Sequence, residues 1–489
     1  MKQPAALFTF TLVFALALAL YVSTTAPSLT WAHNGADGGD LITAAVTNGV
    51  PHPPGYPTYV TLGQLVARIP LGTVAYRFNL FSAFCMALAA GFTALSIWRL
   101  AFFFKEMVAI TASLFFVTAP MVWGQATITE VHALNAGLVA CIVYLISPTV
   151  FQGKPVSLRR FMLAAGLWGV AFGNSLTVAA LTPLFIIAGW RVRHVSPTPF
   201  PSIWPIIAFL AGVSVYAAIP LRAAQQPPVN WGNPTSLERF LALITAQLYQ
   251  GYALSTPPAE IWSRLIAFAQ LIVTQYGWLG VILGAAGVYA ALISANTNWR
   301  WLAVTLVLYL LFAVTYSAAD SALYLLPIWM LGAWAIARGL LRLAEYTARF
   351  PRPAPSAVLI LVLLLGPLAS VFVHFPAMNL RGDHTAADFA QAALIAAPPR
   401  AILITENDGQ TFTLWYYRHV AEQRPDLAVV DRRLAGYPWY DAMLRAQGSV
   451  PVLPGLDPAE TWLDRVAQLN PGRPVCIIDR ISAQMSCQA

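Results

Sequence analysis

Two carboxylates and a histidine follow directly after the first apolar segment of the chain. Asp37 and Asp40 are three residues apart, and His52 follows in a proline-rich run at 50–57. If a helix begins at Asp40, both acids lie near one face at its positive N-terminal end. A carboxylate that accepts a proton just outside a membrane is what a transferase needs to activate a hydroxyl group. The alternative is a helix-capping aspartate followed by a structural turn.

The composition is that of an integral membrane protein. Of 489 residues, 58% are hydrophobic and only 10% are charged, with a mean hydropathy of +0.64. Soluble globular chains carry roughly 25% charged residues. The formal net charge of +8 indicates an excess of Lys and Arg in cytoplasmic loops, which would attract anionic lipid. We do not interpret it as a nucleic-acid-binding surface.

Apolar runs predict a mainly α-helical, polytopic protein with about eleven spans. The first run could be a cleaved signal peptide, although a retained helix is preferred because further apolar runs follow it. The pair at 161–173 and 176–190 could instead form one broken hairpin. The predicted spans are 7–22, 78–98, 108–122, 132–146, 161–173, 176–190, 203–219, 271–293, 301–315, 322–337 and 357–373.

Charges in the connections predict the orientation. With the N-terminus inside, most short inward connections contain Arg or Lys, whereas the outward ones near 125–130, 174–175 and 317–321 contain neither. This places the N-terminus inside, the C-terminus outside, and the long loop 26–77 on the outer face. Two amphipathic pieces of that loop, 41–48 and 58–69, suit helices at the membrane interface.

The chain is expected to divide into a membrane domain at 1–374 and a small outer α/β domain at 375–489. In the second part charges become frequent, and short apolar runs alternate with helical patterns. Cys476 and Cys487 could pair if this part lies outside the cell. The predicted strands are 401–405, 427–431 and 475–479, and the predicted helices are 412–422, 439–447 and 458–469.

Polar side chains gather at the outward ends of the predicted spans. Ionisable groups at the edge of the hydrocarbon are expensive and usually paired or functional. Each also has a structural alternative: Glu130 could pair with Arg77 or Arg222, and Asp320 could cap a helix. The set comprises Asp37, Asp40, His52, Arg77, Asn79, Gln125, Thr129, Glu130, His132, Asn174, Thr177, Arg222, Asn230, Trp231, Asp320 and Tyr324.

No cofactor is expected from these residues. A divalent metal site could be drawn from Asp37, Asp40, His52 and Glu130, but no His-Glu-x-x-His or Cys-x-x-Cys spacing supports one. There is no Walker loop and no dinucleotide fingerprint. A soluble nucleotide donor used from the cytoplasm is therefore not expected.

At these residues the sequence resembles a known family. Asp37-Gly38-Gly39-Asp40 and His52-Pro53-Pro54-Gly55-Tyr56-Pro57 are similar to the Asp-Ser-Gly-Glu and His-Pro-Pro-Gly-Tyr-Pro signature of a bacterial membrane-protein family. That family is related to the eukaryotic O-mannosyltransferases that act on plexin-type receptor domains, within the GT-C glycosyltransferase superfamily. Further similar segments are 77–83, 129–134, 173–177, 230–234, 412–417 and 424–426. The sequence departs from the pattern at Asp40, where the family has Glu, and at Ser175, where it has His.

The resemblance implies an inverting sugar transfer, with mannose favoured, from a polyprenyl-phosphate donor to a hydroxyl on the outer face of the bacterial cytoplasmic membrane. The acceptor would be a protein or a glycan. Asp37 would accept the hydroxyl proton, with Asp40 and His52 orienting it or the acceptor. Arg222 is the first choice for the phosphate clamp and Arg77 the second. The expected substrate-binding residues are His52, Tyr56, Asn79, Glu130, His132, Asn174, Asn230, Trp231 and Asp320.

Two other classes of protein remain open. A transporter of lipid-linked glycans would also need apolar grooves and intramembrane polar groups, but it predicts inverted repeats, which the sequence does not show. A non-catalytic scaffold whose outer domain binds a partner would tolerate Asp37→Asn. A glycosyltransferase would not.

Overall fold

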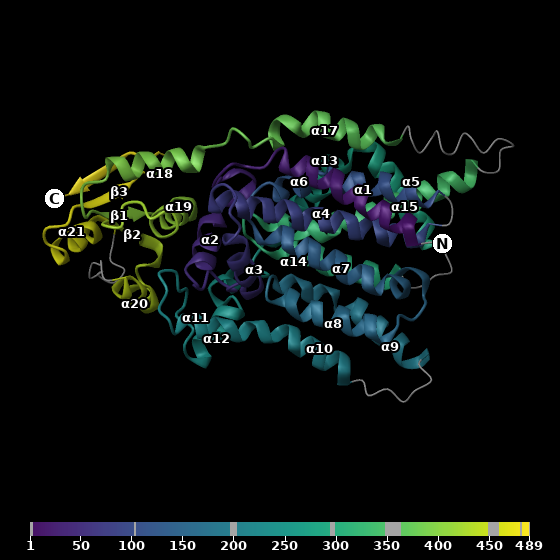
Figure 1. Ribbon diagram of the computed structural model, residues 1–489, viewed down its shortest axis with the longest axis horizontal. Coiled ribbons are helices and arrows are strands. Elements are labelled where there is room, and N and C mark those ends of the chain that lie inside the picture. Colours follow the sequence, from purple (N-terminus) through teal and green to yellow (C-terminus); the bar gives the residue numbers. More distant parts are fainter. Residues whose placement is uncertain are drawn as a thin grey trace.

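The molecule is an elongated helical body with a small α/β domain at one end. The computed structural model describes residues 3–101, 104–195, 203–293, 299–347, 363–447, 459–479 and 482–488. The N-terminus lies at the end of the body opposite the α/β domain (Figure 1).

Seven helical segments in the described ranges are long and apolar enough to cross a membrane. An eighth is counted if α5 (Lys105–Val117) and α6 (Pro120–Ala126), which are bent 72° apart, form one broken span. The seven comprise α1 (Gln3–Val22), α4 (Val74–Leu100), α7 (Val131–Gln152), η2 with α9 (Leu176–Leu181 and Thr182–Val195), α10 with η3 and α11 (Ile203–Val213, Ser214–Ala217 and Ala218–Ala223), α13 (Pro258–Leu292), and η5 with α15 (Ser321–Leu325 and Leu326–Thr347).

The prediction of eleven spans is therefore too high for the described residues. The apolar run at 108–122 divides at Pro120, because proline cannot continue the helix without losing a backbone hydrogen bond. Three other apolar runs form helices shorter than a bilayer requires: α8 (Leu158–Phe172), α14 (Trp299–Thr315) and α17 (Leu365–Met378). The first residues of the predicted span 357–373 lie outside the described ranges.

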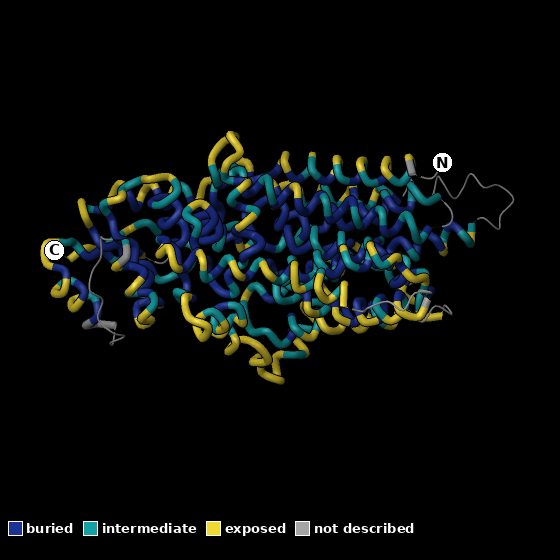
Figure 2. Tube along the Cα trace, turned by 60° about the horizontal axis from the view of Figure 1, so that its bottom comes forward, coloured by how far each residue is buried: buried dark blue, intermediate teal, exposed yellow. Residues whose placement is uncertain are grey.

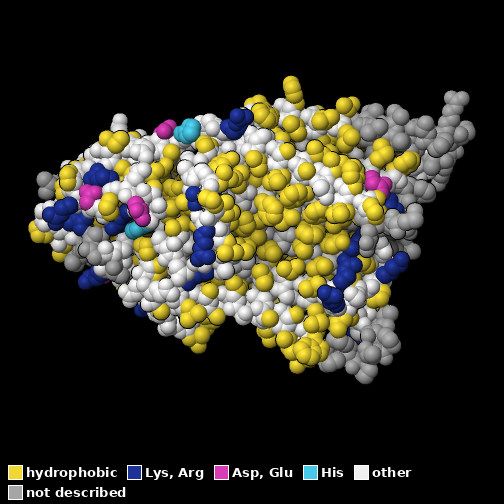
Figure 3. Space-filling model, viewed as in Figure 1, with side chains coloured by type: hydrophobic (Ala, Val, Ile, Leu, Met, Phe, Trp, Pro, Cys, Tyr) yellow, Lys and Arg dark blue, Asp and Glu magenta, His cyan; other side chains and the backbone are white. Residues whose placement is uncertain are grey.

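The surface of the body is apolar between two charged ends. Figure 3 shows a broad hydrophobic area over the helices, with Lys, Arg, Asp and Glu gathered toward both ends of the molecule. The helices are buried along their inward faces and exposed along their outward faces (Figure 2). An apolar belt bounded by charges is the surface that a membrane-spanning protein presents to lipid.

Several short helices lie at the end of the body that faces the α/β domain. The two predicted interfacial pieces are helical, as α2 (Gly38–Val46) and α3 (Pro57–Ala67). Three further short helices lie at the same end: η1 (Ala32–Asp37), α12 (Leu237–Ile244) and η4 (Gln247–Tyr252). Two of these helices, α2 and η1, contact helix α19 (Asp408–His419) of the α/β domain.

The α/β domain is built on a four-stranded sheet in the order β2-β1-β3-β4. β1 is parallel to β2 and β3, and β4 is antiparallel to β3. A disulfide joins Cys476 to Cys487 across the last pair of strands. The elements are α18 (Thr385–Ala396), β1 (Ile402–Thr405), α19 (Asp408–His419), β2 (Ala428–Asp431), η6 (Arg432–Leu434), α20 (Pro438–Ala446), α21 (Ala459–Leu469), β3 (Val475–Ile478) and β4 (Met485–Gln488).

The domain is docked on the membrane body through α19, which lies against α2 (Figure 1). A Cβ at Gly39 would lie 2.1 Å from the carbonyl oxygen of Phe412, so only glycine permits this approach. Trp31 donates from its indole nitrogen to the Gly409 carbonyl at 3.2 Å and to Thr413 Oγ1 at 3.1 Å. These contacts fix the start of α19 over the first outer loop.

Candidate functional site

A cavity of about 900 Å³ lies where the membrane body meets the α/β domain. Its walls come from five parts of the chain: the first outer loop, the start of α7, the segment before α9, the η4 region, and the end of α14 with the α14–α15 connection. Asp408 and Phe412 of α19 complete it. The volume suits a small polar substrate together with part of a lipid.

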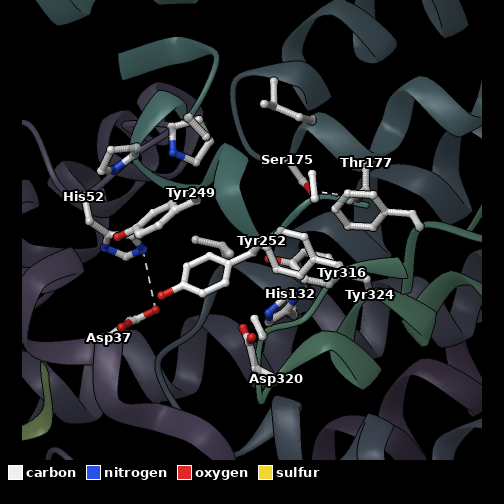
Figure 4. A pocket seen from close by; sticks show the side chains of 18 of the residues that line it. Asp37, His52, His132, Ser175, Thr177, Tyr249, Tyr252, Tyr316, Asp320 and Tyr324 are labelled. Atoms are coloured by element: carbon white, nitrogen blue, oxygen red, sulfur yellow. Dashed lines mark hydrogen bonds and ion pairs between the residues drawn. The ribbon is translucent and has the colours of Figure 1, made fainter. Parts of the chain in front are cut away.

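Asp37, His52 and Asp40 form a connected network on one wall. Asp40 is fully buried and accepts three hydrogen bonds. The backbone N–H of His52 donates at 3.0 Å, its Nδ1 lies at 2.7 Å, and Trp231 Nε1 donates at 3.0 Å. The other ring nitrogen of His52, Nε2, lies 3.5 Å from Asp37 Oδ2 (Figure 4). Asp40 therefore fixes the imidazole, and the imidazole faces Asp37.

Helix α2 explains why the two acids differ. Asp37 is the residue before the helix, with a side chain 37% exposed, and it lines the cavity. Asp40 lies in the first turn, where its side chain points inward beneath the proline-rich turn that carries His52. The three-residue spacing thus leaves one carboxylate open to a substrate and one enclosed.

The surroundings of Asp37 and His52 shift the pKa of both groups. Partial loss of water contact inside the cavity raises the pKa of Asp37 to about 6, although the charge of His52 opposes this rise. Burial disfavours the charged imidazole, but the carboxylates of Asp37 and Asp40 outweigh it and raise the pKa of His52 to about 10. At neutral pH this gives an ionised Asp37 beside an imidazolium, which suits a general base.

Glu130 is a second acid of the same cavity. It stands at the N-terminus of α7, is only 4% exposed, and accepts the Val131 backbone N–H through Oε2 at 3.3 Å. Within the described part of the chain its Oε1 has no hydrogen-bond partner. Burial, followed by the charge of Asp37, raises the pKa of Glu130. A buried polar atom without a partner indicates a place for a ligand.

The opposite end of the cavity holds His132, Asp320 and two tyrosines. In Figure 4, His132 and Asp320 lie together, with Tyr316 and Tyr324 beside them. The ring of Tyr324 lies 5.9 Å from that of His132 and 5.5 Å from that of Tyr316. The cavity thus has two polar ends separated by an aromatic middle.

Several residues expected to bind substrate do not line the cavity and instead form hydrogen bonds with the segments around it. Asn79 is 1% exposed and donates to the carbonyls of Ala26 and Ser28. Asn174 and Asn230 likewise donate to backbone carbonyls, those of Val131 and Ala223. Trp231, also expected to bind substrate, is 3% exposed and donates a hydrogen bond to Asp40 instead. Of the nine expected residues, five line the cavity: His52, Tyr56, Glu130, His132 and Asp320.

Neither arginine predicted to clamp a phosphate lines the cavity in this arrangement. Arg77 donates to three backbone carbonyls, those of Ala67, Leu71 and Gly72. Arg222 is 6% exposed and donates to Thr61 Oγ1 at 2.8 Å. Among the described residues of the lining there is no Lys or Arg, and the described ranges contain no group of three or more His, Cys, Asp or Glu placed to hold a metal.

Sequence reasoning missed part of the lining. Tyr249 and Tyr252 come from η4, and Asp408 and Phe412 come from the α/β domain. The Tyr249 ring lies 6.5 Å from that of His52, and the Phe412 ring is nearly parallel to it at 6.2 Å. Aromatic rings in a polar outward connection were the available signal for η4. Nothing in the local pattern of α19 separates Asp408 from an ordinary helix-start residue.

Comparisons with known proteins agree with this architecture. Residues 37–197 match the family model described as the N-terminal domain of protein O-mannosyl-transferase TMEM260, and residues 386–456 match TMEM260-associated domain 2. Protein O-mannosyl-transferase TMEM260 of Mus musculus is 27% identical over 476 residues, covering 92% of this chain and 65% of the mouse protein. The Dictyostelium discoideum protein of that name is 21% identical, covering 88% of this chain and 58% of its own length. The chain thus spans about three fifths of these curated relatives.

Solved structures show the fold. ArnT from Cupriavidus metallidurans bound to undecaprenyl phosphate matches with a TM-score of 0.54 at 13% identity, over 98% of this chain and 97% of ArnT. The apo form matches with a TM-score of 0.56 at 14% identity over the same shares. The chain is therefore a membrane protein of the GT-C fold, similar to the O-mannosyl-transferases of the TMEM260 type.

Proposed function

We propose that this chain transfers a sugar, mannose by analogy with its relatives, from a polyprenyl-phosphate donor to a hydroxyl group of a protein. The observation that carries the proposal is the carboxylate of Asp37. It faces a cavity of about 900 Å³ and lies opposite His52, which a fully buried second carboxylate, Asp40, holds in place. A base fixed in this way can activate a hydroxyl at the level of the lipid headgroups.

The reaction would be a single displacement with inversion. The acceptor oxygen forms a bond to the anomeric carbon as its proton passes to Asp37, and the bond from that carbon to the phosphate oxygen breaks. The lipid phosphate leaves with the bonding electron pair. His52, charged at neutral pH because Asp37 and Asp40 raise its pKa, keeps Asp37 ionised between turnovers.

A lipid-linked donor is supported by the fold and by the cavity. One of the ArnT structures that share this fold is bound to undecaprenyl phosphate. Tyr309 and Phe312 of α14 also line the cavity, and the Phe312 ring lies 5.0 Å from that of Tyr324, so this wall offers apolar surface to the first units of a lipid tail. Arg222 remains the predicted phosphate clamp, and to act as one its guanidinium would have to leave Thr61 and turn toward the cavity.

The outer face of a bacterial cytoplasmic membrane is the proposed compartment, with the N-terminus inside. The division into a membrane part at 1–374 and an outer part at 375–489 belongs to the same proposal. The disulfide of the α/β domain supports it, because disulfides persist in oxidising compartments. The distance between the N-terminus and this domain along the helical body supports it too (Figure 1).

Purified protein incubated with polyprenyl-phosphate-mannose and a Ser/Thr-containing acceptor protein tests the proposal. We expect a mass increase of one hexose on the acceptor, absent with Asp37→Asn. Mass spectrometry of extracytoplasmic glycoproteins from cells with and without the chain gives the native acceptor. If the Asp37→Asn protein restores the glycoproteins as fully as the wild type, the chain acts as a scaffold or transporter and the proposal fails.

A further inference from the structure

The start of α19 brings the α/β domain into the reaction cavity itself. Asp408 and Phe412 line the cavity, and the ring of Phe412 lies parallel to His52 at 6.2 Å. The backbone of Phe412 touches Gly39 so closely that no side chain fits between them. This wall therefore cannot move away from Asp37 without separating the two parts of the protein.

Asp408 is held in place and still accessible. Its side chain is 49% exposed, and its Oδ1 accepts from Arg433 Nη2 at 2.6 Å. The same guanidinium is anchored on Asp431, whose side chain is fully buried. Among the described residues, none donates a hydrogen bond to the second carboxylate oxygen of Asp408, which is therefore available to a ligand.

The position of Asp408 selects which substrate it can meet. A lipid-linked donor enters from among the spans, because its tail is insoluble in water, whereas α19 belongs to the domain outside the membrane body (Figure 1). Asp408 is also close enough to Asp37 to contribute to the rise in its pKa. The carboxylates of Asp37 and Asp408 together repel a phosphate and attract hydrogen-bond donors. A polypeptide in extended form offers a row of backbone N–H donors.

We propose that the first turn of α19 is the acceptor-binding wall of the cavity, where Asp408 accepts a hydrogen bond from a backbone N–H of an extended, Ser/Thr-bearing polypeptide. This inference rests on the proposed function for its assignment of the acceptor. The hydroxyl to be modified then lies between Asp408 and Asp37, with Phe412 packing against the neighbouring residues of the peptide. Glu130, whose buried Oε1 has no partner among the described residues, is independent evidence that this cavity receives a polar ligand.

The test uses the full-length protein and a fluorescein-labelled Ser/Thr-rich peptide. Loss of a hydrogen bond to a charged group predicts that Asp408→Ala raises the peptide Kd, measured by fluorescence anisotropy, about tenfold. Asp408→Asn keeps an accepting oxygen, so we expect a smaller rise. The KM for the peptide should increase by the same factor, while the KM for the lipid-linked sugar stays within about twofold.

Asp441→Ala is the matched control. Asp441 pairs with Arg445 at 2.9 Å in the same domain and does not line the cavity, so peptide binding should be unchanged. The inference is overturned if the wild type does not bind the peptide, if Asp408→Ala binds it as tightly as the wild type, or if donor and peptide KM rise together. A wild type that binds the peptide through Asp408 but transfers no sugar would defeat the proposed function alone.

Discussion

Asp40→Asn removes the buried charge that fixes His52 and leaves the shape of the side chain almost unchanged. Asp40 accepts from two nitrogens of His52 and from Trp231, and it is fully buried. An asparagine can accept some of these hydrogen bonds, but its amide places a donor against a donor. The variant therefore perturbs the electrostatics of the network more than its packing.

Coulomb's law gives the magnitude for a hydrogen-bonded charge pair such as His52 and Asp40, whose nearest atoms are 2.7 Å apart. A unit charge about 4 Å from another is worth about 4 kcal/mol at an effective dielectric constant of 20, which equals about a thousandfold change in proton affinity. Removing Asp40 would then lower the pKa of His52 from about 10 toward about 7. His52 becomes partly neutral at neutral pH, and Asp37 loses the cation that opposes the rise in its own pKa.

The assay is the pH dependence of kcat/KM for sugar transfer. In the wild type, kcat/KM should rise with pH as Asp37 loses its proton near pH 6 and then reach a plateau. In Asp40→Asn the acidic limb should stay close to that of the wild type, because His52 is still protonated there, and kcat/KM should instead fall as the pH rises through 7 and His52 loses its charge. Asp441→Asn, in an exposed pair of the α/β domain, is the control. A folded Asp40→Asn protein whose profile overlays that of the wild type would refute the argument that Asp40 acts through His52.

Three further perturbations separate the other roles. Asp37→Asn should lower kcat about 10²- to 10⁴-fold without changing the amount of protein in the membrane, as measured by single-turnover transfer and immunoblot; near wild-type turnover would remove Asp37 from the mechanism. Arg222→Ala should raise the KM for the lipid-linked donor more than that for the acceptor, and unchanged donor kinetics would exclude the clamp. Gly39→Ala places a Cβ against the Phe412 carbonyl, so it should destabilise the domain contact by about 1–3 kcal/mol. Limited proteolysis should then cut between the domains faster than in the wild type. An equal rate would show that the contact between α2 and α19 accommodates the added methyl group.

The first outer loop could be predicted from the sequence because its chemistry and its local structure coincide. Asp37, Asp40 and His52 stand in a short stretch where a helix start and a proline-rich turn restrict the backbone. The two interfacial helices and three strands of the α/β domain follow from hydrophobic patterns of the correct period. The strand at Met485–Gln488 was missed because it is mostly exposed and polar, so it lacks a buried alternating face.

The remaining lining could not be predicted, because it depends on contacts between distant segments. Tyr249 reaches His52 from a connection nearly 200 residues away, and Phe412 does so from another domain. Trp231 is the converse case, a residue that was expected to bind substrate and does not line the cavity. Its residue type favours sugar stacking, yet its partner is the buried oxygen of Asp40. Residue type at the outer ends of spans therefore predicts which groups gather there, but packing decides which of them reach the cavity.

The charge of the cavity connects these observations. Four carboxylates line it, those of Asp37, Glu130, Asp320 and Asp408, and the described lining contains no Lys or Arg. Since like charges repel a phosphate, a lipid-phosphate donor needs a compensating cation at the moment of transfer. Among the described lining residues His52 supplies a cation, because its pKa is raised by the two carboxylates beside it, and Arg222 is the predicted second one. A donor-bound state in which Arg222 has left Thr61 for the cavity would unite the acid-rich lining with the anionic donor, and it would make donor binding the step that completes the site.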